Sequence, residues 1–579
     1  MGIVIEALGA SAFIGRSCFL VTFNNTFRVI LDFGVHLTLK GADQFPQLDR
    51  SLDLNTIDAV VITHFHLDHV GALPYLMRRF TGPVFMTEPT AVCSPMIMED
   101  FAEIMARKSA RPLYTRDDML KSMQRVTTVR FRETVHVRPG LSVTFYPAGH
   151  LLGAAMVHVQ TTMGSAFYTG DFNVNVDRHL LPALPPFALR PDVLITESTF
   201  GTMIRDAQEY REQQFIQDTV RTLERGGRVL VPTHALGRAQ DVCLLLDRYW
   251  DRMGLTYPII ATKGLLERAT EVYKHFHSQH WMRPGLTSDH FNYRHIKLVD
   301  PSGTDLAAMK GPLVVLSSPS ALNSGFTLRF FNAWCSDPNT LVVAPGYNMP
   351  GTITDKIISG EVKQVRVDKG DVVPIECTVK HLSFAAHADL KSIAVVAEAL
   401  QPSSVVLVHG NATKMPQLKH ILRSSLQLPV YIPSARQNTI SIPVTSGYSG
   451  LLPYSAVAPL LEHLTEPGVG IEVRGPVAEG PTLVRGGAPI AQSVVGQVVL
   501  QCRVRSPKEV DDALRELYNG RVVRLVNTSF PVVFELDDAV SLLVDGESAV
   551  LEFDGTVEAV SLAGEVEQRV LGLAGGMAR

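Results

Sequence analysis

Six residues, His64 to His69, constrain this 579-residue chain more than any other stretch. They read HFHLDH, so three histidines and one aspartate follow directly after the apolar run Ile57–Thr63. That run is short, rich in β-branched residues and free of glycine and proline, which is typical of a buried strand. The cluster should therefore begin at the carboxyl end of a strand, just before a helix that the sequence predicts over Val70–Arg79.

The spacing of these four side chains indicates two metal ions rather than one. In an extended stretch His64 and His66 point to the same side, whereas Asp68 and His69 can face elsewhere once the chain turns. Imidazole and carboxylate groups suit zinc or a similar divalent ion, and a single closed tetrahedral site would leave no position open. A solvated histidine-rich turn is the alternative, and it is disfavoured for four such side chains in six positions.

Three further segments complete a known pattern. HFHLDH resembles the HxHxDH motif of the metallo-β-lactamase superfamily, and the other motifs of that superfamily occur in the expected order. Asp32 ends the run RVILDFG, His150 lies in PAGHLLGAA, and Asp171 lies in FYTGDFN. A lone His150 would more often be a hydrogen-bonded loop residue, and Gly-Asp is a common turn. The resemblance therefore rests on all four motifs together.

A second series of motifs resembles the β-CASP branch of the superfamily, whose members process nucleic acids. Glu197 in LITESTFGT, His387 in SFAAHADL and His409 in VVLVHG match the three motifs of that branch. The run from Glu224 to Gln240, ERGGRVLVPTHALGRAQ, is also close to the family. The resemblance covers about residues 1–440.

The resemblance implies a role for each motif residue. It implies two Zn²⁺ or similar divalent ions that share Asp171. One ion would be held by His64, His66, His150 and Asp171, and the other by Asp68, His69, Asp171 and His409. Asp32 would support the ligands by hydrogen bonding. His387 would be a general acid held by Glu197, and Asp68 would count among the catalytic groups as well as the ligands.

Simpler readings exist for the acid pair and for the basic residues of this region. Glu197 could pair with an arginine, and His387 could cap the helix that starts near Ala388. Arg238 and Lys263 are candidates for holding RNA phosphates, although either could be a solvated surface charge. His234 and the loop Ser317–Ser320 depart from the family pattern and could alter how RNA seats.

The family fold is an αββα sandwich, and the sequence predicts an α/β protein of that type with a second α/β domain inserted. Strand-like GRVLVPT, GPLVVLSS and NTLVVAPG alternate with helical stretches such as Arg238–Trp250, which favours an α/β insertion. A small α/β domain should follow at the C-terminus. The expected domains are 1–201 (first part of the metallo-β-lactamase domain), 202–380 (β-CASP domain), 381–440 (second part of the metallo-β-lactamase domain) and 441–579 (C-terminal dimerisation or docking region).

Charge is distributed unevenly along the chain. The formal net charge is −4, yet residues 441–579 alone hold 18 acidic and 10 basic side chains. The catalytic part is thus only mildly basic and carries no polybasic stripe, so partner subunits should supply much of the electrostatic attraction for RNA. The C-terminal region combines strands such as PVVFEL with a helix predicted from Ser506, and it could be either an independent domain or a docking module.

Cysteine usage and the first residues favour an intracellular protein. Six cysteines are scattered without a CxxC pair, which fits a reducing compartment and offers no sulfur-based zinc site. MGIVIEALG lacks the basic segment of a secretory signal. The resemblance implies a nuclear location, with the cytoplasm as the alternative.

Within the β-CASP branch, stretches such as FMTEPTAVCSP and APGYNMPGTITDKIISGE resemble the Integrator type of endonuclease. This implies a zinc-dependent endoribonuclease that cleaves nascent RNA polymerase II transcripts, small nuclear RNA precursors included, by two-metal hydroxide attack on a phosphodiester. It also implies RNA as substrate, a heterodimer with a catalytically degenerate β-CASP paralogue through the C-terminal region, further subunits of an Integrator-like complex, and no membrane. The alternatives are a pre-mRNA 3′-end cleavage endonuclease, a β-CASP exonuclease and a metallo-hydrolase that does not act on RNA.

Overall fold

The computed structural model describes residues 2–444, with short gaps, and the backbone of strands between 471 and 553. The gaps are residues 40, 49–51, 108–113, 187–188, 207, 279, 301, 304–305, 307, 323, 347–352, 367–370, 383, 385 and 435–437. Contacts divide the chain into two compact units, Met1–Pro443 and Val444–Arg579.

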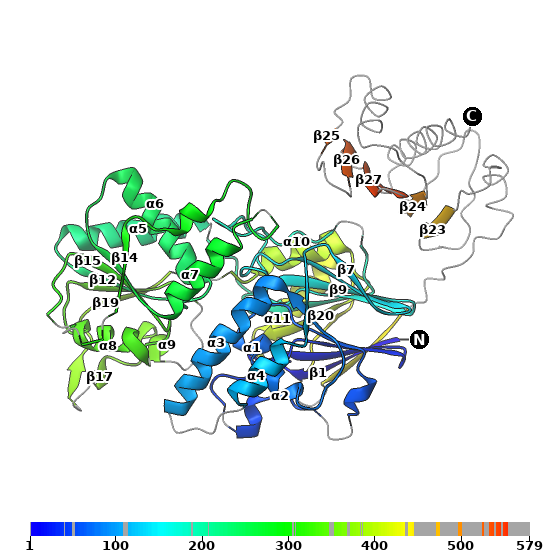
Figure 1. Ribbon diagram of the computed structural model, residues 1–579, viewed down its shortest axis with the longest axis horizontal. Coiled ribbons are helices and arrows are strands. Elements are labelled where there is room, and N and C mark those ends of the chain that lie inside the picture. Colours follow the sequence, from blue (N-terminus) through cyan, green and yellow to red (C-terminus); the bar gives the residue numbers. More distant parts are fainter. Residues whose placement is uncertain are drawn as a thin grey trace. The chain divides into compact units, whose positions relative to one another are not determined.

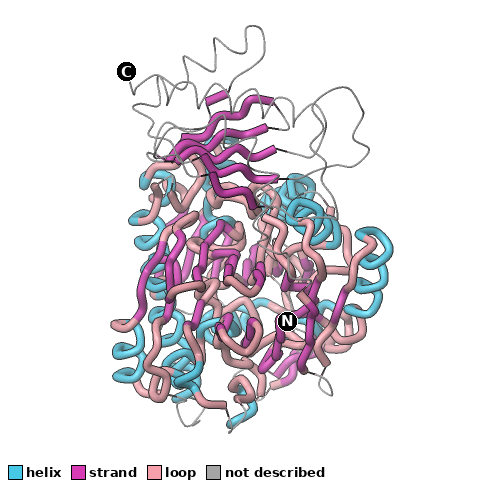
Figure 2. The backbone as a smooth tube through the Cα atoms, turned by 90° about the vertical axis from the view of Figure 1, so that its right-hand side faces the viewer, coloured by secondary structure: helices cyan, strands magenta, loops and turns pink. Residues whose placement is uncertain are grey.

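Two seven-stranded sheets form the centre of the first unit (Figures 1 and 2). The first sheet has the order β22 (Thr439–Pro443), β1 (Gly2–Gly9), β2 (Cys18–Phe23), β3 (Phe27–Leu31), β4 (Ala59–Val61), β5 (Val84–Thr87) and β6 (Val126–Val129). The second has the order β21 (Val430–Tyr431), β20 (Val405–Gly410), β11 (Val193–Ser198), β10 (Gly164–Tyr168), β9 (Ala155–Thr161), β8 (Leu141–Pro147) and β7 (Thr134–Arg138). Phe19 of β2 and Tyr168 of β10 pack edge to face at 5.5 Å, so the sheets meet face to face.

Helices cover the outer faces of this sandwich, as the α/β prediction requires. Buried side chains of α2 (Leu73–Leu76), α3 (Glu88–Arg107) and α4 (Arg116–Met123) share one core with the first sheet. Those of α10 (Leu390–Leu400) and α11 (Met415–Leu426) pack with the second sheet. Two 3-10 turns, η1 (Gly41–Gln44) and η2 (Leu54–Thr56), lie in the loop before β4. None of the described helices is long and apolar enough to cross a membrane.

One predicted helix differs from the structure. The stretch expected to be helical from Val70 to Arg79 forms two short helices, α1 (Leu67–Val70) and α2, separated at Gly71 and Ala72. Pro74 lies in the first turn of α2, where its missing N–H breaks no helical hydrogen bond. Proline at this position favours the start of a new helix over continuation of α1. The chain therefore bends immediately after His69.

A second α/β domain is inserted between β11 and β20. Its six-stranded, all-parallel sheet has the order β14-β13-β15-β12-β16-β19. In chain order its elements are α5 (Gln208–Glu224), β12 (Arg228–Pro232), α6 (Arg238–Met253), β13 (Ile259–Thr262), α7 (Leu265–His275), η3 (Ser288–Phe291), β14 (Ile296–Val299), β15 (Leu313–Ser317), α8 (Gly325–Trp334), β16 (Thr340–Ala344), α9 (Ile353–Ile358), the hairpin β17 (Gln364–Arg366) and β18 (Val372–Pro374), and β19 (Thr378–His381).

The insertion returns to the strand that it leaves. Strands β11 and β20 pair in parallel, with Glu197 opposite Val408. The chain segments that carry Glu197 and His409 are therefore neighbours, although the whole inserted domain separates them in sequence. This confirms the predicted αββα sandwich with an inserted α/β domain, while the expected domain limits stay a prediction.

The second unit contains an antiparallel sheet with the order β23-β24-β28-β27-β26-β25. Its strands are β23 (Ile471–Arg474), β24 (Gly496–Leu500), β25 (Arg524–Leu525), β26 (Val532–Asp537), β27 (Val540–Asp545) and β28 (Ser548–Phe553). The helix predicted from Ser506 lies outside the described residues.

Candidate metal centre

Strand ends bring the predicted ligands together at one edge of the sandwich. The His64–His69 segment follows β4, His150 follows β8, and Asp171 follows β10. His409 is the penultimate residue of strand β20, has a left-handed φ of 49°, and donates its backbone N–H to the Ala10 carbonyl. Each ligand therefore comes from the point where a buried strand ends.

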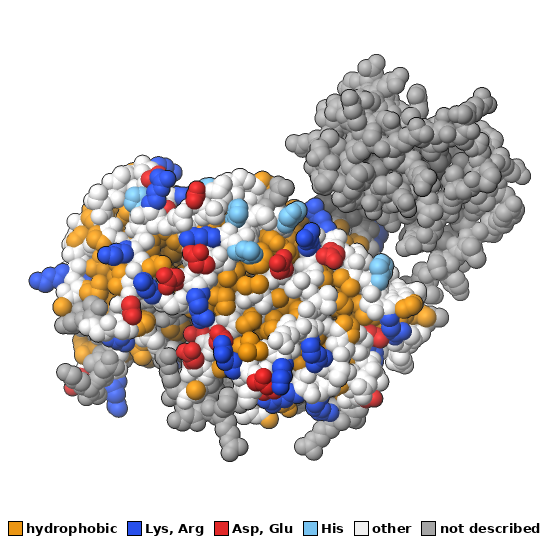
Figure 3. All heavy atoms as spheres, in the orientation of Figure 1, with side chains coloured by type: hydrophobic (Ala, Val, Ile, Leu, Met, Phe, Trp, Pro, Cys, Tyr) orange, Lys and Arg blue, Asp and Glu red, His pale blue; other side chains and the backbone are white. Residues whose placement is uncertain are grey.

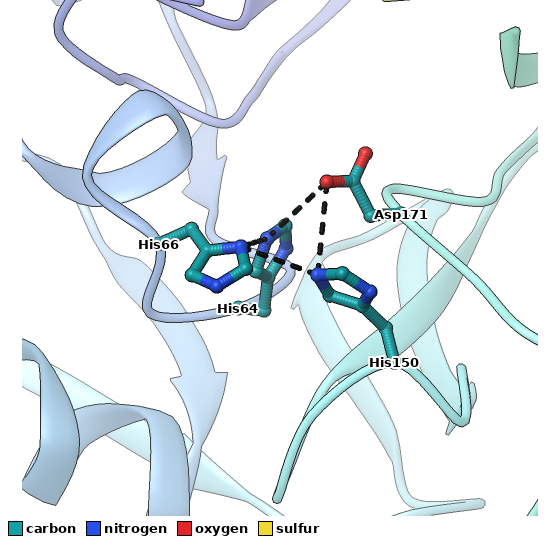
Figure 4. A group of neighbouring side chains, drawn as sticks. All are labelled: His64, His66, His150 and Asp171. Atoms are coloured by element: carbon teal, nitrogen blue, oxygen red, sulfur yellow. Dashed lines mark hydrogen bonds and ion pairs between the residues drawn. The ribbon is translucent and has the colours of Figure 1, made fainter. Parts of the chain in front are cut away.

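His64, His66, His150 and Asp171 form the first group, with one ligand atom from each residue within 4.8 Å of the others (Figure 4). His66 Nδ1 lies 3.2 Å from His64 Nε2 and 3.2 Å from His150 Nε2. Asp171 Oδ2 lies 3.6 Å from His64 Nε2 and 3.8 Å from His150 Nε2. Three rings and one carboxylate thus converge on a single point.

The hydrogen bonds of these rings fit a cation at that point. His64 Nδ1 bonds to the Thr63 hydroxyl at 3.0 Å, and His150 Nδ1 donates to the Ala386 carbonyl at 2.6 Å. The Thr63 hydroxyl donates its own proton to Asp32, so His64 Nδ1 is the donor to it. In neutral His64 and His150 the proton is therefore on Nδ1, and Nε2 is an acceptor. Both Nε2 atoms face His66 Nδ1, which carries at most one proton. At least one pair of nitrogen lone pairs therefore meets at 3.2 Å, an arrangement that a shared metal ion stabilises.

A second group lies on the other side of Asp171 and consists of Asp68, His69 and His409. His409 Nε2 is 3.2 Å from Asp68 Oδ2, and His69 Nε2 is 3.8 Å from the same oxygen. Asp171 reaches this group as well, with Oδ2 3.4 Å from His69 Nε2 and Oδ1 3.4 Å from His409 Nδ1. Asp171 Oδ1 is buried and has no hydrogen-bond partner among the described residues, so it retains a lone pair for a cation.

Burial sets the protonation of the first group. Burial lowers the pKa of His64 and His150 well below the usual value, and it lowers the pKa of His66 to about 3. The three imidazoles are therefore neutral, which is the form that binds metal. Burial raises the pKa of Asp171, but His409, His69 and His387 outweigh that effect and hold it well below its usual range.

Asp32 lies beneath the second group rather than in it. Its backbone has a left-handed φ of 61°, and its carboxylate accepts hydrogen bonds from the Thr63 N–H at 2.7 Å, the Tyr168 hydroxyl at 2.8 Å and His69 Nδ1 at 2.8 Å. The bond to His69 fixes that ring so that Nε2 faces Asp68 and Asp171. This position is the one expected for a residue that supports the site by hydrogen bonding.

Two glycines allow the ligand loops to approach the neighbouring backbone. A Cβ on Gly34 would lie 1.8 Å from the Asp68 carbonyl oxygen, so a side chain there would displace the Asp68–His69 turn. Gly149, directly before His150, has a φ of 66°, and a Cβ there would lie 2.3 Å from the Asn173 carbonyl oxygen. Both positions therefore require glycine, Gly34 because of the close backbone approach and Gly149 because of that approach and its positive φ.

His387 and Glu197 form a buried pair beside the metal groups. His387 Nδ1 donates to Glu197 Oε2 at 2.9 Å, and the other carboxylate oxygen of Glu197 accepts from the Phe172 N–H at 2.8 Å. Burial lowers the pKa of His387, but the carboxylates of Glu197 and Asp171 outweigh burial and raise it. Asp389 is the residue that caps α10, because its side chain accepts from the Ser392 N–H. The simpler reading of His387 as a helix cap is therefore not what the structure shows.

Thr199 is a site residue that sequence reasoning missed. Its hydroxyl donates to Glu197 Oε2 at 2.6 Å and lies 3.1 Å from His409 Nδ1, so it links the acid pair to the second metal group. The polar run Thr196–Thr199 at the end of an otherwise apolar strand was the one available indication in the sequence.

The two basic residues predicted to contact RNA lie in different environments. Lys263 is exposed at the end of β13, as a phosphate-binding side chain would be. Arg238 is largely buried in the first turn of α6, and its guanidinium donates to the carbonyls of His150 at 3.0 Å and Phe384 at 2.9 Å. Arg238 thus has internal partners for its guanidinium, and its expected contact with RNA phosphate stays a prediction.

Comparisons with known proteins agree with this geometry. Residues 20–187 match a metallo-beta-lactamase superfamily domain, 239–357 a Beta-Casp domain, and 372–433 a Zn-dependent metallo-hydrolase RNA specificity domain. The chain is 38% identical to Integrator complex subunit 11 of Gallus gallus over 80% of this chain and 79% of the relative. It is 37% identical to the Danio rerio protein of the same name, over 76% and 74%. It is 36% identical to cleavage and polyadenylation specificity factor subunit 3-II of Arabidopsis thaliana, over 77% and 73%.

Proposed function

The chain belongs to the metallo-β-lactamase/β-CASP family of zinc-dependent RNA endonucleases, and on that premise we propose that it is the catalytic subunit of an Integrator-like complex. In that role it would cut nascent RNA polymerase II transcripts in the nucleus, small nuclear RNA precursors included. Two relatives named for Integrator subunit 11, at 38% and 37% identity, support this assignment over the pre-mRNA cleavage machinery by a small margin, since a third at 35% lies no higher than the cleavage and polyadenylation relatives at 35% to 36%.

One observation supports an active enzyme rather than a scaffold. Each of the seven ligands expected from the family lies in one of two adjoining groups that share Asp171. We assign His64, His66, His150 and Asp171 to one zinc ion. We assign Asp68, His69, Asp171 and His409 to the other. When bound, such an ion pair lowers the pKa of a shared water and stabilises charge on a phosphate undergoing in-line displacement.

The residues of the chain would do the remaining work. Glu197 accepts the Nδ1 proton of His387 and so fixes the ring. The nitrogen that would deliver a proton to the departing ribose oxygen is then Nε2 of His387. The loop of Asp171 is held against the acid pair by its next residue, because Glu197 also accepts the N–H of Phe172. Ligands and acid are therefore positioned by one connected set of hydrogen bonds.

Surface charge supports a role within a larger assembly. On the face of the molecule in Figure 3, basic and acidic side chains are interspersed, with no continuous basic band over the described residues. Non-specific RNA affinity grows with the number of phosphates that lysine and arginine neutralise. We infer that partner subunits supply much of that contact, with Lys263 as a candidate on this chain.

Circular single-stranded RNA distinguishes the proposed endonuclease from the other activities. The purified full chain with zinc should convert a circle into a linear product of full length, and His387→Ala in a parallel preparation should not. An intact circle together with shortening of a linear RNA of the same sequence would instead identify an exonuclease. Hydrolysis of a thioester with both RNAs intact would identify a hydrolase that does not act on RNA.

We further propose that the second unit pairs with a related, catalytically degenerate subunit. Among the described strands of its antiparallel sheet, β23 and β25 are the two edges, and an edge strand offers unpaired backbone groups to another chain. Val473→Pro would remove one N–H from edge strand β23. Purification of tagged full-length protein from its own cells should recover the degenerate paralogue with the native sequence and lose it with this variant, while zinc content stays unchanged. Equal recovery with both would exclude the β23 edge.

A further inference from the structure

The loop that supplies Asp171 also contacts the inserted domain. Six residues after Asp171, Asp177 accepts a hydrogen bond on its carbonyl from Arg283 Nη1 at 2.7 Å. The His179 carbonyl accepts from the Arg283 N–H at 3.0 Å, and Leu180 forms a β-bridge with Met282. A loop of the sandwich is therefore fastened to the inserted domain close to the metal centre.

Four charged side chains, which we call the junction quartet, are buried where this loop meets α6. Asp177 and His179 come from the loop, and Arg238 and Asp241 come from the first turn of α6. Asp177, His179 and Asp241 are 3%, 0% and 7% exposed. None of these residues belongs to the metal groups described above.

The quartet is held together by ion pairs across the two domains. His179 Nδ1 lies 2.8 Å from Asp241 Oδ1 and 3.4 Å from Asp177 Oδ1. Arg238 forms a close ion pair with Asp241 and lies 3.9 Å from Asp177 Oδ2. Two carboxylates thus face one guanidinium and one imidazole in the protein interior.

Protonation of His179 would leave this group without net charge. Burial lowers the pKa of His179, but Asp241 and Asp177 outweigh it and raise the pKa to about 9. Burial also raises the pKa of Asp241, although Arg238 and His179 oppose that rise. With both cations charged and both carboxylates ionised, the quartet has no net charge, which is the condition under which buried ions are tolerated.

Arg238 connects the quartet to the catalytic residues through the main chain. Its Nη2 donates to the His150 carbonyl at 3.0 Å, and its Nη1 donates to the Phe384 carbonyl at 2.9 Å. His150 is a ligand in the first metal group, and Phe384 lies three residues before His387. One guanidinium therefore ties together a ligand loop, the loop of the general acid and the inserted domain.

We propose that Arg238 is a positioning residue for RNA cleavage, and that the junction quartet holds it so that the inserted domain sets the placement of His150 and His387. The predicted effect of Arg238 on the cleavage rate rests on the proposed endonuclease function. Its predicted effect on the two loops does not. Without Arg238 the two carbonyls lose a shared charged donor, and the two loops become free to move independently.

A third metal site is the competing reading, because Asp177, His179 and Asp241 offer ligand atoms within 4.8 Å of one another. Arg238 argues against it. The guanidinium already pairs with Asp241 and neutralises one of the two carboxylates, so a divalent ion beside it would add uncompensated positive charge to a buried space. The quartet needs no metal to be neutral.

Arg238→Met, compared with Arg228→Met, tests the proposal in the full chain. Arg228 is a matched control, because its side chain is also 12% exposed, pairs with one carboxylate (Asp337) and donates to one carbonyl (Met309). Hydrogen exchange followed by mass spectrometry should show faster exchange in residues 148–154 and 384–388 of Arg238→Met, on the order of tenfold. Arg228→Met should leave these segments unchanged.

The rate of RNA cleavage provides the second readout. Arg238→Met should lower kcat by about 10²-fold with KM nearly unchanged, because it displaces catalytic groups rather than an RNA contact. Arg238→Lys, which keeps one cationic donor, should recover part of the loss. Arg228→Met should keep the native kcat.

Three results would overturn the proposal. The first is native exchange in residues 148–154 and 384–388 of Arg238→Met, whatever its activity. The second is an equal kcat loss in Arg228→Met, which would mean a general effect of stability. The third is a loss of one zinc ion per chain in His179→Gln, which would make the quartet a metal site. If Arg238→Met does not fold, Asp241→Asn removes one anion without changing shape and should show the same faster exchange.

Discussion

Histidine serves different purposes in this protein according to what its Nδ1 atom contacts. His64 and His150 use Nδ1 on a hydroxyl and a carbonyl, which turns a neutral Nε2 toward the ligand point. His387 uses Nδ1 on the Glu197 carboxylate, which favours the protonated ring. Histidine is thus suited to bind metal where Nδ1 bonds to a hydroxyl or carbonyl, and suited to act as an acid where Nδ1 bonds to a carboxylate.

Asp171→Ala should weaken the binding of both ions enough that at least one of them is lost. Its two oxygens lie 3.4 Å from His69 Nε2 and His409 Nδ1, and Oδ2 also faces His64, so both groups lose a ligand at once. Elemental analysis of the purified full chain should fall from two zinc ions to one or none. Asp192→Ala removes a part-buried carboxylate that binds Ser165 at the other end of β11, and it should keep both ions. Two ions in Asp171→Ala would refute its bridging assignment.

His387→Ala should separate metal binding from turnover. The ring lies beside the ligand groups but belongs to neither, so both zinc ions should remain. The rate should fall by about 10²–10⁴-fold, as is usual when a general acid is removed. His381→Ala, which removes a histidine bonded to the Gly346 carbonyl in the inserted domain, is the control and should cleave normally. Native turnover in His387→Ala would exclude the role.

At the scale of elements, the strand ends were the most predictable feature. The run before His64 predicted β4. The runs before Asp32, Asp171 and His409 predicted β3, β10 and β20 in the same way. Short β-branched runs that end in polar residues rarely form anything but a buried strand. The break at Gly71 and the burial of Arg238 were not predictable. The first depends on how α2 packs against the sheet, and the second on carbonyls from two distant loops.

The junction between loop 177–180 and α6 should respond to pH. His179 faces Asp177 on its own loop, Asp241 and Arg238 on α6, and the Tyr273 ring of α7 at 5.4 Å. Its pKa rises from 6.5 to about 9 on folding, so its stabilising contribution is complete below pH 6.5 and is lost as pH rises through 9. The free energy of unfolding should fall by up to about 3 kcal/mol across that window.

Denaturant unfolding at pH 6.5, 8 and 9.5 measures this loss. His179→Gln cannot be protonated, so its stability should be lower at pH 6.5 and nearly flat across the same range. A native protein whose stability is as flat as that of the variant would contradict a charged His179.

At the scale of the whole molecule, the metal ions should be part of the stability of the first unit. The two groups bring together two carboxylates and five imidazoles, most of them buried, whose lone pairs converge on shared points. Binding to the folded state alone adds about 4 kcal/mol per site when free zinc exceeds its dissociation constant a thousandfold. A chelator should therefore lower the melting temperature, and added zinc should restore it. An unchanged melting temperature after complete removal of zinc would contradict this coupling.

The packing of distant segments and the partner subunits were harder to predict from the sequence than the metal centre. The ligand residues and their order along the chain identify the metal chemistry, because few other kinds of site use this set of histidines and aspartates. The pairing of Glu197 with His387 depends on β11 lying beside β20 across the entire insertion, and only the family resemblance indicated it. The partner of the C-terminal sheet depends on a second chain, so it stays a proposal.

Anomalous scattering at the zinc edge from a crystal of the full chain tests the central claim most directly. The account predicts two peaks that both contact Asp171, at zinc–ligand distances of about 2.0–2.2 Å. One should lie among His64, His66 and His150, and the other among Asp68, His69 and His409. A single peak, or zinc bound only at the Asp177, His179 and Asp241 cluster, would contradict it.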